Sequence, residues 1–124
     1  MYLVGEGLLE AYIEGPNSGM LKAGEIATGD IFGEISLLTG APRNATVVSV
    51  TDAIIYEILR LDVQELLSAR PQVAEQLSRV AAKRQLQNEA VRQVASKNAP
   101  QEAPAHFDLA SEILAKMRVL LDYL

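Results

Sequence analysis

Hydrophobic and polar positions change their period near Leu61, and this change divides the chain into two parts. Before Leu61, short apolar stretches are separated by glycine, proline, asparagine and aspartate, a pattern typical of strands and turns. After Leu61, apolar residues recur at steps of three and four, as on one face of a helix. The pattern therefore predicts an α+β fold in which a β-rich part is followed by helices.

The first part is predicted to form two pairs of strands around a short helix. The strands are expected over residues 2–14, 20–27, 45–50 and 53–59. The turn-forming sequence Gly15–Gly19 closes the first pair into a hairpin, and Thr51-Asp52 separates the second pair. Residues 34–38 are long enough for a single helical turn.

Two helices are predicted directly after the strands. Asp62, followed by Glu65 at the spacing of a reciprocal carboxylate, is expected to cap the first of them. Pro71 interrupts the helical pattern. The stripe of the second helix comprises Val73, Leu77, Val80, Arg84, Gln87, Val91 and Val94. Because its middle is polar, we expect this helix to leave the core and run into solvent or onto a partner.

A final helix is predicted beyond a short linker. The linker covers residues 98–106 and contains two prolines, and Asp108 is expected to cap the helix that follows. The apolar face of this helix comprises Ala110, Ile113, Leu114, Met117, Leu120, Leu121 and Leu124. Such a continuous face favours packing or self-association over a role as a ligand lid.

Composition narrows the class of protein. The chain has 124 residues, of which 49% are hydrophobic and 22% charged, as expected for one soluble globular domain. It has no cysteine and one histidine, which excludes disulfides and thiolate metal sites. No basic leader and no long apolar run are present, so we expect a cytoplasmic segment that does not itself enter a membrane.

Charge is distributed unevenly along the chain. Residues 1–58 contain eight acidic and two basic residues, whereas the remainder contains eight acidic and nine basic residues. This acidic balance lacks the positive footprint of a nucleic-acid-binding protein. We also find no nucleophile with a partner base and no phosphate-binding GK[ST] loop, so an enzyme is not expected. Arg43 is almost alone as a cation in its half.

The surroundings of Arg43 have the chemistry of a phosphate site. It lies in Phe32–Val47, FGEISLLTGAPRNATV, which is otherwise nearly uncharged. A one-turn helix starting near Gly33 would direct free backbone N–H groups at an anion. The Arg43 guanidinium can grip two phosphate oxygens at once. Since Glu34 would repel a phosphate, it is expected to accept hydrogen bonds from another group, such as a sugar hydroxyl.

The same stretch closely resembles the phosphate-binding cassette of the cyclic nucleotide-binding domain family, FGE-x-[AS]-LL-x-x-x-PR-x-A-[TS]-V. Members of that family fold as an eight-stranded, jelly-roll-like antiparallel β-roll followed by helices, and they bind cAMP or cGMP. The resemblance implies that Arg43 pairs with the cyclic phosphate and that Glu34 accepts the ribose 2′-OH. It also implies a binding set of Ile26, Gly33, Glu34, Ile35, Ser36, Arg43, Asn44 and Ala45, in which Ile26 forms an apolar wall for the base and the backbone completes the phosphate cradle.

The resemblance also implies a division of the chain. The expected parts are a β-roll over residues 1–60 with its cassette at 32–47, regulatory helices over 61–97, the linker over 98–106 and an amphipathic helix over 107–124. Because family members have a helical segment and two strands before the part that matches Tyr2–Ile13, we expect the roll to be incomplete at its N-terminus. Unpaired strands, or the face of Ile113, Leu114, Met117 and Leu121, would then favour a homo-oligomer.

Three functions are compatible with these features. The first is a regulatory domain that binds a cyclic nucleotide, cAMP in preference to cGMP, with no further cofactor, and that relays binding to its helices. With no DNA-binding region and a leucine-rich final helix, such a domain most resembles the soluble tail of a bacterial channel, either a mechanosensitive-type channel or a potassium channel. The second is the sensor part of a transcription regulator, although residues 97–124 leave room for only one further helix. The third is an interaction domain of the same family with an empty pocket.

Overall fold

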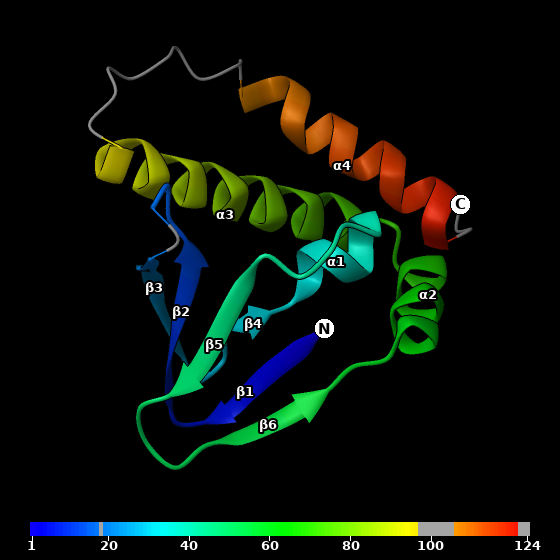
Figure 1. Ribbon diagram of the computed structural model, residues 1–124. Coiled ribbons are helices and arrows are strands. Elements are labelled where there is room, and N and C mark those ends of the chain that lie inside the picture. Colours follow the sequence, from blue (N-terminus) through cyan, green and yellow to red (C-terminus); the bar gives the residue numbers. More distant parts are fainter. Residues whose placement is uncertain (18, 97–105, 122–124) are drawn as a thin grey trace.

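The computed structural model describes residues 1–17, 19–96 and 106–121. Two three-stranded antiparallel sheets are followed by helices, which confirms the predicted fold class of a β-roll with C-terminal helices (Figure 1). The strand β4 was not predicted from the sequence. The strands are β1 (Tyr2–Glu6), β2 (Leu8–Glu14), β3 (Met20–Ala27), β4 (Ile31–Phe32), β5 (Ala45–Ser49) and β6 (Ile54–Glu57). The helices are α1 (Glu34–Thr39), α2 (Arg60–Ala69), α3 (Gln72–Ser96) and α4 (His106–Leu121).

The predicted strand over residues 2–14 is two strands, because the chain turns at Gly7. Gly7 has a φ of 110°, and a Cβ there would lie 2.6 Å from the Asp52 carbonyl oxygen. Thr28 and Thr51 satisfy the backbone around this turn, since their hydroxyls accept hydrogen bonds from the N–H groups of Gly7 and Leu8. The prediction of one strand is therefore wrong. The turn sends β1 and β2 into different sheets.

The same turn separates the second predicted pair of strands. β5 pairs with β2, whereas β6 pairs with β1, so the two strands are consecutive in sequence but do not form a hairpin. The first hairpin is confirmed: β2 and β3 pair along their whole length, with Leu9 opposite Ile26. Val4, Leu9 and Ile26 form a small buried cluster between the two sheets.

The helices form the larger core. α3 runs across one end of the two sheets, and α4 lies along the outer side of α3 (Figure 1). This core contains Leu38 of α1, Val63 and Leu67 of α2, Ala81 of α3 and Met117 of α4, all of which are fully buried. The apolar face of α4 is thus used within the chain. The expectation that Ile113 and Met117 are free for self-association is wrong, because they are 2% and 0% exposed.

Two helix starts differ from the sequence prediction. α2 begins at Arg60, and Asp62 accepts a hydrogen bond from the Leu59 N–H at 3.0 Å. Asp62 therefore stabilises the first turn from its third position and is not the N-cap. α4 begins at His106, so Asp108 lies inside this helix instead of before it. Most of the predicted linker, residues 98–105, lies outside the described residues. Pro71 does separate α2 from α3.

Candidate nucleotide site

A pocket opens between the strands and α3, at the end of the molecule where the cassette lies. Its volume is about 300 Å³, at the small end of the range for small-molecule sites. All eight predicted binding residues line it: Ile26, Gly33, Glu34, Ile35, Ser36, Arg43, Asn44 and Ala45. Residues that lie up to 19 positions apart in the sequence therefore share one cavity, which is the geometry that a ligand site requires.

Helix α1 arises where the cassette sequence predicts it. Gly33 precedes the helix with a φ of 71°, a left-handed conformation that glycine adopts without strain. Gly40 ends the helix in the same conformation, with a φ of 73°. Glu34, Ile35 and Ser36 make up the first turn and line the pocket. The N–H groups of a first helical turn have no partner within the helix, so they are available to a ligand.

Arg43 lies beside this helix start and has no acidic partner among residues 1–17, 19–96 and 106–121. Its Nη1 donates a hydrogen bond to the Gly33 carbonyl oxygen at 2.9 Å. Its Cζ lies 5.5 Å from the centre of the Tyr2 ring. The side chain is exposed at the pocket, so its positive charge is available to an anion.

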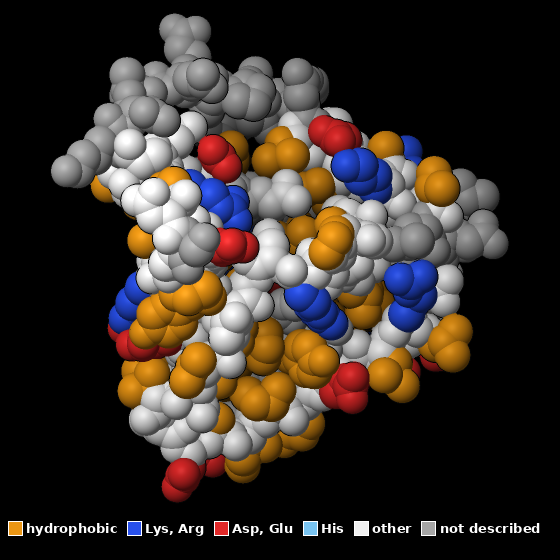
Figure 2. Space-filling model, in the orientation of Figure 1, with side chains coloured by type: hydrophobic (Ala, Val, Ile, Leu, Met, Phe, Trp, Pro, Cys, Tyr) orange, Lys and Arg blue, Asp and Glu red, His pale blue; other side chains and the backbone are white. Residues whose placement is uncertain are grey.

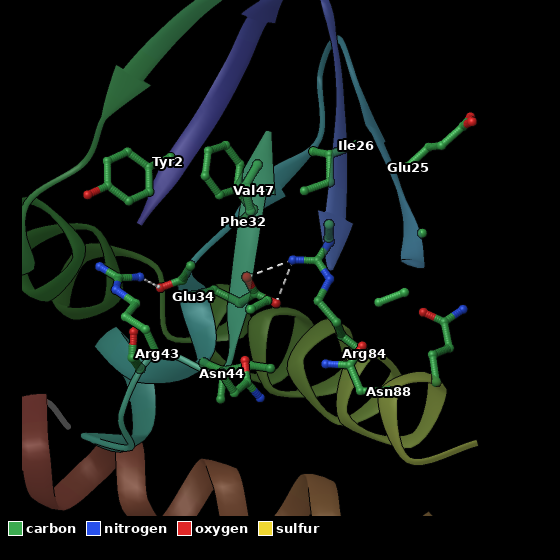
Figure 3. Close-up of a pocket in the computed structure, with 18 of the residues that line it drawn as sticks. Tyr2, Glu25, Ile26, Phe32, Glu34, Arg43, Asn44, Val47, Arg84 and Asn88 are labelled. Atoms are coloured by element: carbon green, nitrogen blue, oxygen red, sulfur yellow. Dashed lines mark hydrogen bonds and ion pairs between the residues drawn. The ribbon is translucent and has the colours of Figure 1, made fainter. Parts of the chain in front are cut away.

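Glu34 has the opposite environment. Its side chain is 1% exposed, and both carboxylate oxygens accept hydrogen bonds from Arg84 Nη1, at 2.7 and 2.8 Å (Figure 3). The same nitrogen lies 2.9 Å from the Ile31 carbonyl oxygen. The attraction between an arginine and a carboxylate in contact is stronger where one of the two side chains is shielded from water. Arg84 thus supplies the partner that a carboxylate buried beside this pocket requires.

Helix α3 supplies residues that the sequence did not reveal. Arg84, Gln87 and Asn88 all line the pocket, so the polar middle of the stripe faces this cavity. Farther along the helix, Val94 is 81% exposed, which agrees with the expectation that α3 leaves the core. In the sequence, only the polar interruption of the apolar stripe at Arg84 and Gln87 could have indicated a pocket here. Polar residues at these positions are equally compatible with solvent, so the interruption alone does not distinguish the two. Asn88 did not interrupt the stripe, and nothing in the sequence singled it out.

Asn88 is a buried amide that is 6% exposed. No group within the described part of the chain hydrogen-bonds to its side chain. Buried amides without partners are rare in folded proteins, because their polar atoms lose hydration without compensation. An amide of this kind that lines a pocket is well placed to bind the polar edge of a ligand.

The opposite wall of the pocket is mostly apolar. Ile26 comes from β3 and Val47 from β5, the two strands that flank β2 in one sheet, and Phe32 comes from β4; all three are labelled in Figure 3. Ile26 is 5% exposed and also belongs to the cluster between the sheets. The pocket therefore combines an apolar wall suited to a flat ring with charged and amide groups suited to phosphate and hydroxyls.

Comparison with known proteins decides the family. The model of the cyclic nucleotide-binding domain matches residues 1–70, more than half of the chain. The chain belongs to the cyclic nucleotide-binding domain family. This membership agrees with the resemblance of the cassette and with the two sheets and following helices.

Relatives in this family belong to different kinds of protein. A cyclic nucleotide-gated potassium channel of Rhizobium etli is 37% identical over 60 residues, which cover 48% of this chain and 17% of that protein. A cAMP-dependent protein kinase regulatory subunit of Neurospora crassa is 46% identical over 55 residues, covering 39% of this chain and 14% of that protein. The matched segment thus spans less than a fifth of the length of these relatives.

The fold also resembles that of a solved structure. The crystal structure of Thermus thermophilus Catabolite Activator Protein aligns with a TM-score of 0.64 at 20% identity, covering 98% of this chain and 65% of that chain. At this identity the likeness concerns the fold alone. Within the described residues, we find no group of three or more side chains that could hold a metal ion, and no helix has the length and apolar character to cross a membrane.

Proposed function

We propose that this chain is a regulatory domain that binds cAMP in the pocket between the cassette and α3. One observation carries the proposal: the same cavity is lined by an exposed Arg43, which has no acidic partner in the described chain, and by a buried Glu34. Arg43 supplies the charge that a cyclic phosphate requires. Glu34 uses one lone pair on each oxygen for Arg84, which leaves acceptor sites for the ribose hydroxyl.

Calorimetric titration with cAMP, cGMP and 5′-AMP tests this proposal. We expect cAMP to bind most tightly, because the site offers one unpaired guanidinium, which matches the single negative charge of a cyclic phosphate better than the higher charge of 5′-AMP. Arg43→Ala should weaken cAMP binding about 30–150-fold, the effect of losing a charge-assisted hydrogen bond. Arg79→Ala, on the exposed side of α3, is the matched control. Equal binding by the parent and Arg43→Ala would contradict the proposal.

The helices are proposed to relay binding. α3 contributes Arg84, Gln87 and Asn88 to the pocket and packs against α4 on its other side. A ligand that contacts these side chains therefore favours those positions of α3 in which the contacts form. Because α4 packs on α3, α4 would move with it. Hydrogen exchange with and without cAMP should show altered protection in α3 and α4 of the parent protein and no change in Arg43→Ala. Changes confined to the cassette would exclude the relay.

The proposed effector is a bacterial ion channel, with this domain on the cytoplasmic side. Two cyclic nucleotide-gated potassium channels, of Rhizobium etli and Mesorhizobium japonicum, are among the relatives, each 37% identical over 60 residues. The kinase subunit relatives give a second candidate, a regulator of a protein kinase. Fusing the domain to a channel pore and recording cAMP-dependent current would separate the two.

Self-association is proposed through the strands and not through α4. A set of large apolar side chains on β5, β6, α2 and the connections between them is exposed: Val48, Val50, Ile54, Ile55, Tyr56, Leu59, Leu61 and Leu66. On the face of the molecule shown in Figure 2, hydrophobic side chains gather in the lower part, over the sheet that contains β1 and β6. Clustered apolar surface of this kind favours association. Light scattering at micromolar concentration should detect a dimer or larger species, and a monodisperse monomer would reject this proposal.

A further inference from the structure

Tyr2 connects β1 to the cassette through its ring. The strand register pairs Tyr2 with Phe32, and their rings stack with centres 5.1 Å apart and planes 23° apart. Phe32 directly precedes Gly33 and the helix start. The ring of Tyr2 is therefore fixed relative to the part of the backbone that would cradle a phosphate.

Arg43 lies over the same ring. Its guanidinium carbon is 5.5 Å from the centre of the Tyr2 ring, within the range of a cation–π interaction (Figure 3). Its other contact is the hydrogen bond to the Gly33 carbonyl oxygen. Since no carboxylate in the described part of the chain pairs with Arg43, the ring and this carbonyl define where its charge lies.

This arrangement has a consequence for affinity. A free arginine side chain adopts many rotamers, and fixing one of them when an anion binds opposes binding. A ring that already holds the guanidinium reduces this loss. The attraction to the ring also needs no hydrogen-bond acceptor, so the Arg43 N–H groups that do not bond to Gly33 remain available to phosphate oxygens.

We propose that Tyr2 is a positioning residue, whose ring holds the Arg43 guanidinium in place for the phosphate of the ligand. The inference rests on the proposed cyclic nucleotide binding, but it assigns a role to a residue outside the cassette that needs no contact with the ligand. The interaction requires an aromatic face and not the tyrosine hydroxyl.

A set of variants measured by cAMP titration tests the role of the ring. Tyr2→Phe should bind within about twofold of the parent, whereas Tyr2→Leu should bind about 3–10-fold more weakly. The control is Tyr56→Leu, which removes an exposed tyrosine from β6 and should leave affinity unchanged. If Tyr2→Leu does not fold, 3,4,5-trifluorophenylalanine in place of Tyr2 keeps the ring shape and weakens the attraction for a cation. It should bind more weakly than Tyr2→Phe.

A double-mutant cycle with Arg43→Ala distinguishes positioning from a general structural effect. In that background Tyr2→Leu should change affinity by less than about twofold, because no guanidinium remains to be held. Equal losses in both backgrounds, or equal binding by the Phe and trifluorophenylalanine proteins, would overturn the positioning role. A parent protein that binds no cyclic nucleotide would refute the proposed function and this role together. Loss of binding in Arg43→Ala without any effect of Tyr2→Leu would refute the role of Tyr2 alone.

Discussion

Arg84 Nη1 lies 2.7 and 2.8 Å from the two carboxylate oxygens of Glu34, although 50 residues separate them in the chain. This pair joins α3 to the start of α1. The Glu34 side chain is 1% exposed and the Arg84 side chain is 31% exposed. Water can therefore partly replace Glu34 as a partner of Arg84, but it cannot replace Arg84 as a partner of Glu34. Removing the arginine would leave a buried charge without its partner.

Arg84→Ala should therefore lower the free energy of unfolding by about 2–4 kcal/mol, as measured by urea denaturation. Arg79→Ala, an exposed arginine on the same helix, should change it by less than about 0.5 kcal/mol. Glu34→Gln combined with Arg84→Ala should be less destabilised than the two single changes together, since the buried charge is gone. Additive losses would show that the two residues do not depend on each other.

Glu34 is expected to distinguish a ribose from a deoxyribose. A hydroxyl bound to a charged acceptor contributes about 1.5–3 kcal/mol, so 2′-deoxy-cAMP should bind the parent at least about tenfold more weakly than cAMP. Glu34→Gln should narrow this gap. Glu34→Gln also weakens the contact with Arg84, but this change affects the affinity for both ligands. The ratio of the two affinities, measured within each protein, therefore reports on the sugar hydroxyl alone. Glu25→Gln, at the pocket but paired with Lys22, should keep the gap unchanged. A gap that survives in Glu34→Gln would mean that this carboxylate does not bind the sugar.

Gly33→Ala should disturb both the helix start and the phosphate site. A Cβ at Gly33 would collide with Arg43 Nη1, and the φ of 71° is unfavourable for alanine. We expect a loss of about 1–2 kcal/mol in stability and at least about tenfold in cAMP affinity. Gly29→Ala is the control, because its φ of 91° is also strained but nothing lies within 4 Å of the added Cβ. It should lose stability and keep its affinity.

Asn88 should affect stability and binding in opposite directions. Its amide is buried at 6% exposure, with no hydrogen-bonding partner in the part of the chain that the structure describes. Asn88→Leu should therefore raise the free energy of unfolding of the ligand-free protein by up to about 1–2 kcal/mol, if the leucine fits, and should weaken cAMP binding about fivefold. Thermal unfolding with and without ligand measures both effects. A destabilised protein that binds cAMP normally would show that Asn88 serves packing alone.

The preference for cAMP over cGMP depends on the base side of the pocket. Asn44 and Asn88 both line the cavity and carry a donor and an acceptor. We expect cAMP to bind more tightly, and Asn44→Thr to improve cGMP binding by offering a hydroxyl to the guanine amino group. Titration of both ligands against the parent and this variant measures the change. Equal or reversed affinities in the parent would reject the preference.

Met117 anchors α4 in the core, since it is 0% exposed. Met117→Ala should lower the free energy of unfolding by about 2–4 kcal/mol because a cavity remains. Val119→Ala, on the same helix at 85% exposure, should have little effect. Equal stability of the two variants would mean that α4 is not docked in solution.

The sequence by itself determined the local parts of this protein. Three features follow from signals that act within a few residues, namely turn residues, short apolar runs and the spacing of apolar positions. They are the hairpin of β2 and β3, the one-turn helix α1, and the separation of α2 from α3 at Pro71. The cassette is contiguous: all of the predicted pocket residues except Ile26 lie between Gly33 and Ala45, and the motif alone indicated them.

Only the tertiary structure decided what lies opposite that stretch. The left-handed turn at Gly7 sends β1 and β2 into different sheets, and this separates β5 from β6 in a way that no local pattern encodes. Packing of α3 across the sheets brings Arg84 to Glu34 and Asn88 to the pocket, and the strand register brings Tyr2 beneath Arg43. A polar residue on a helix satisfies the same sequence pattern whether it meets water or a buried carboxylate, because burial is a property of the assembled surfaces and not of the residue.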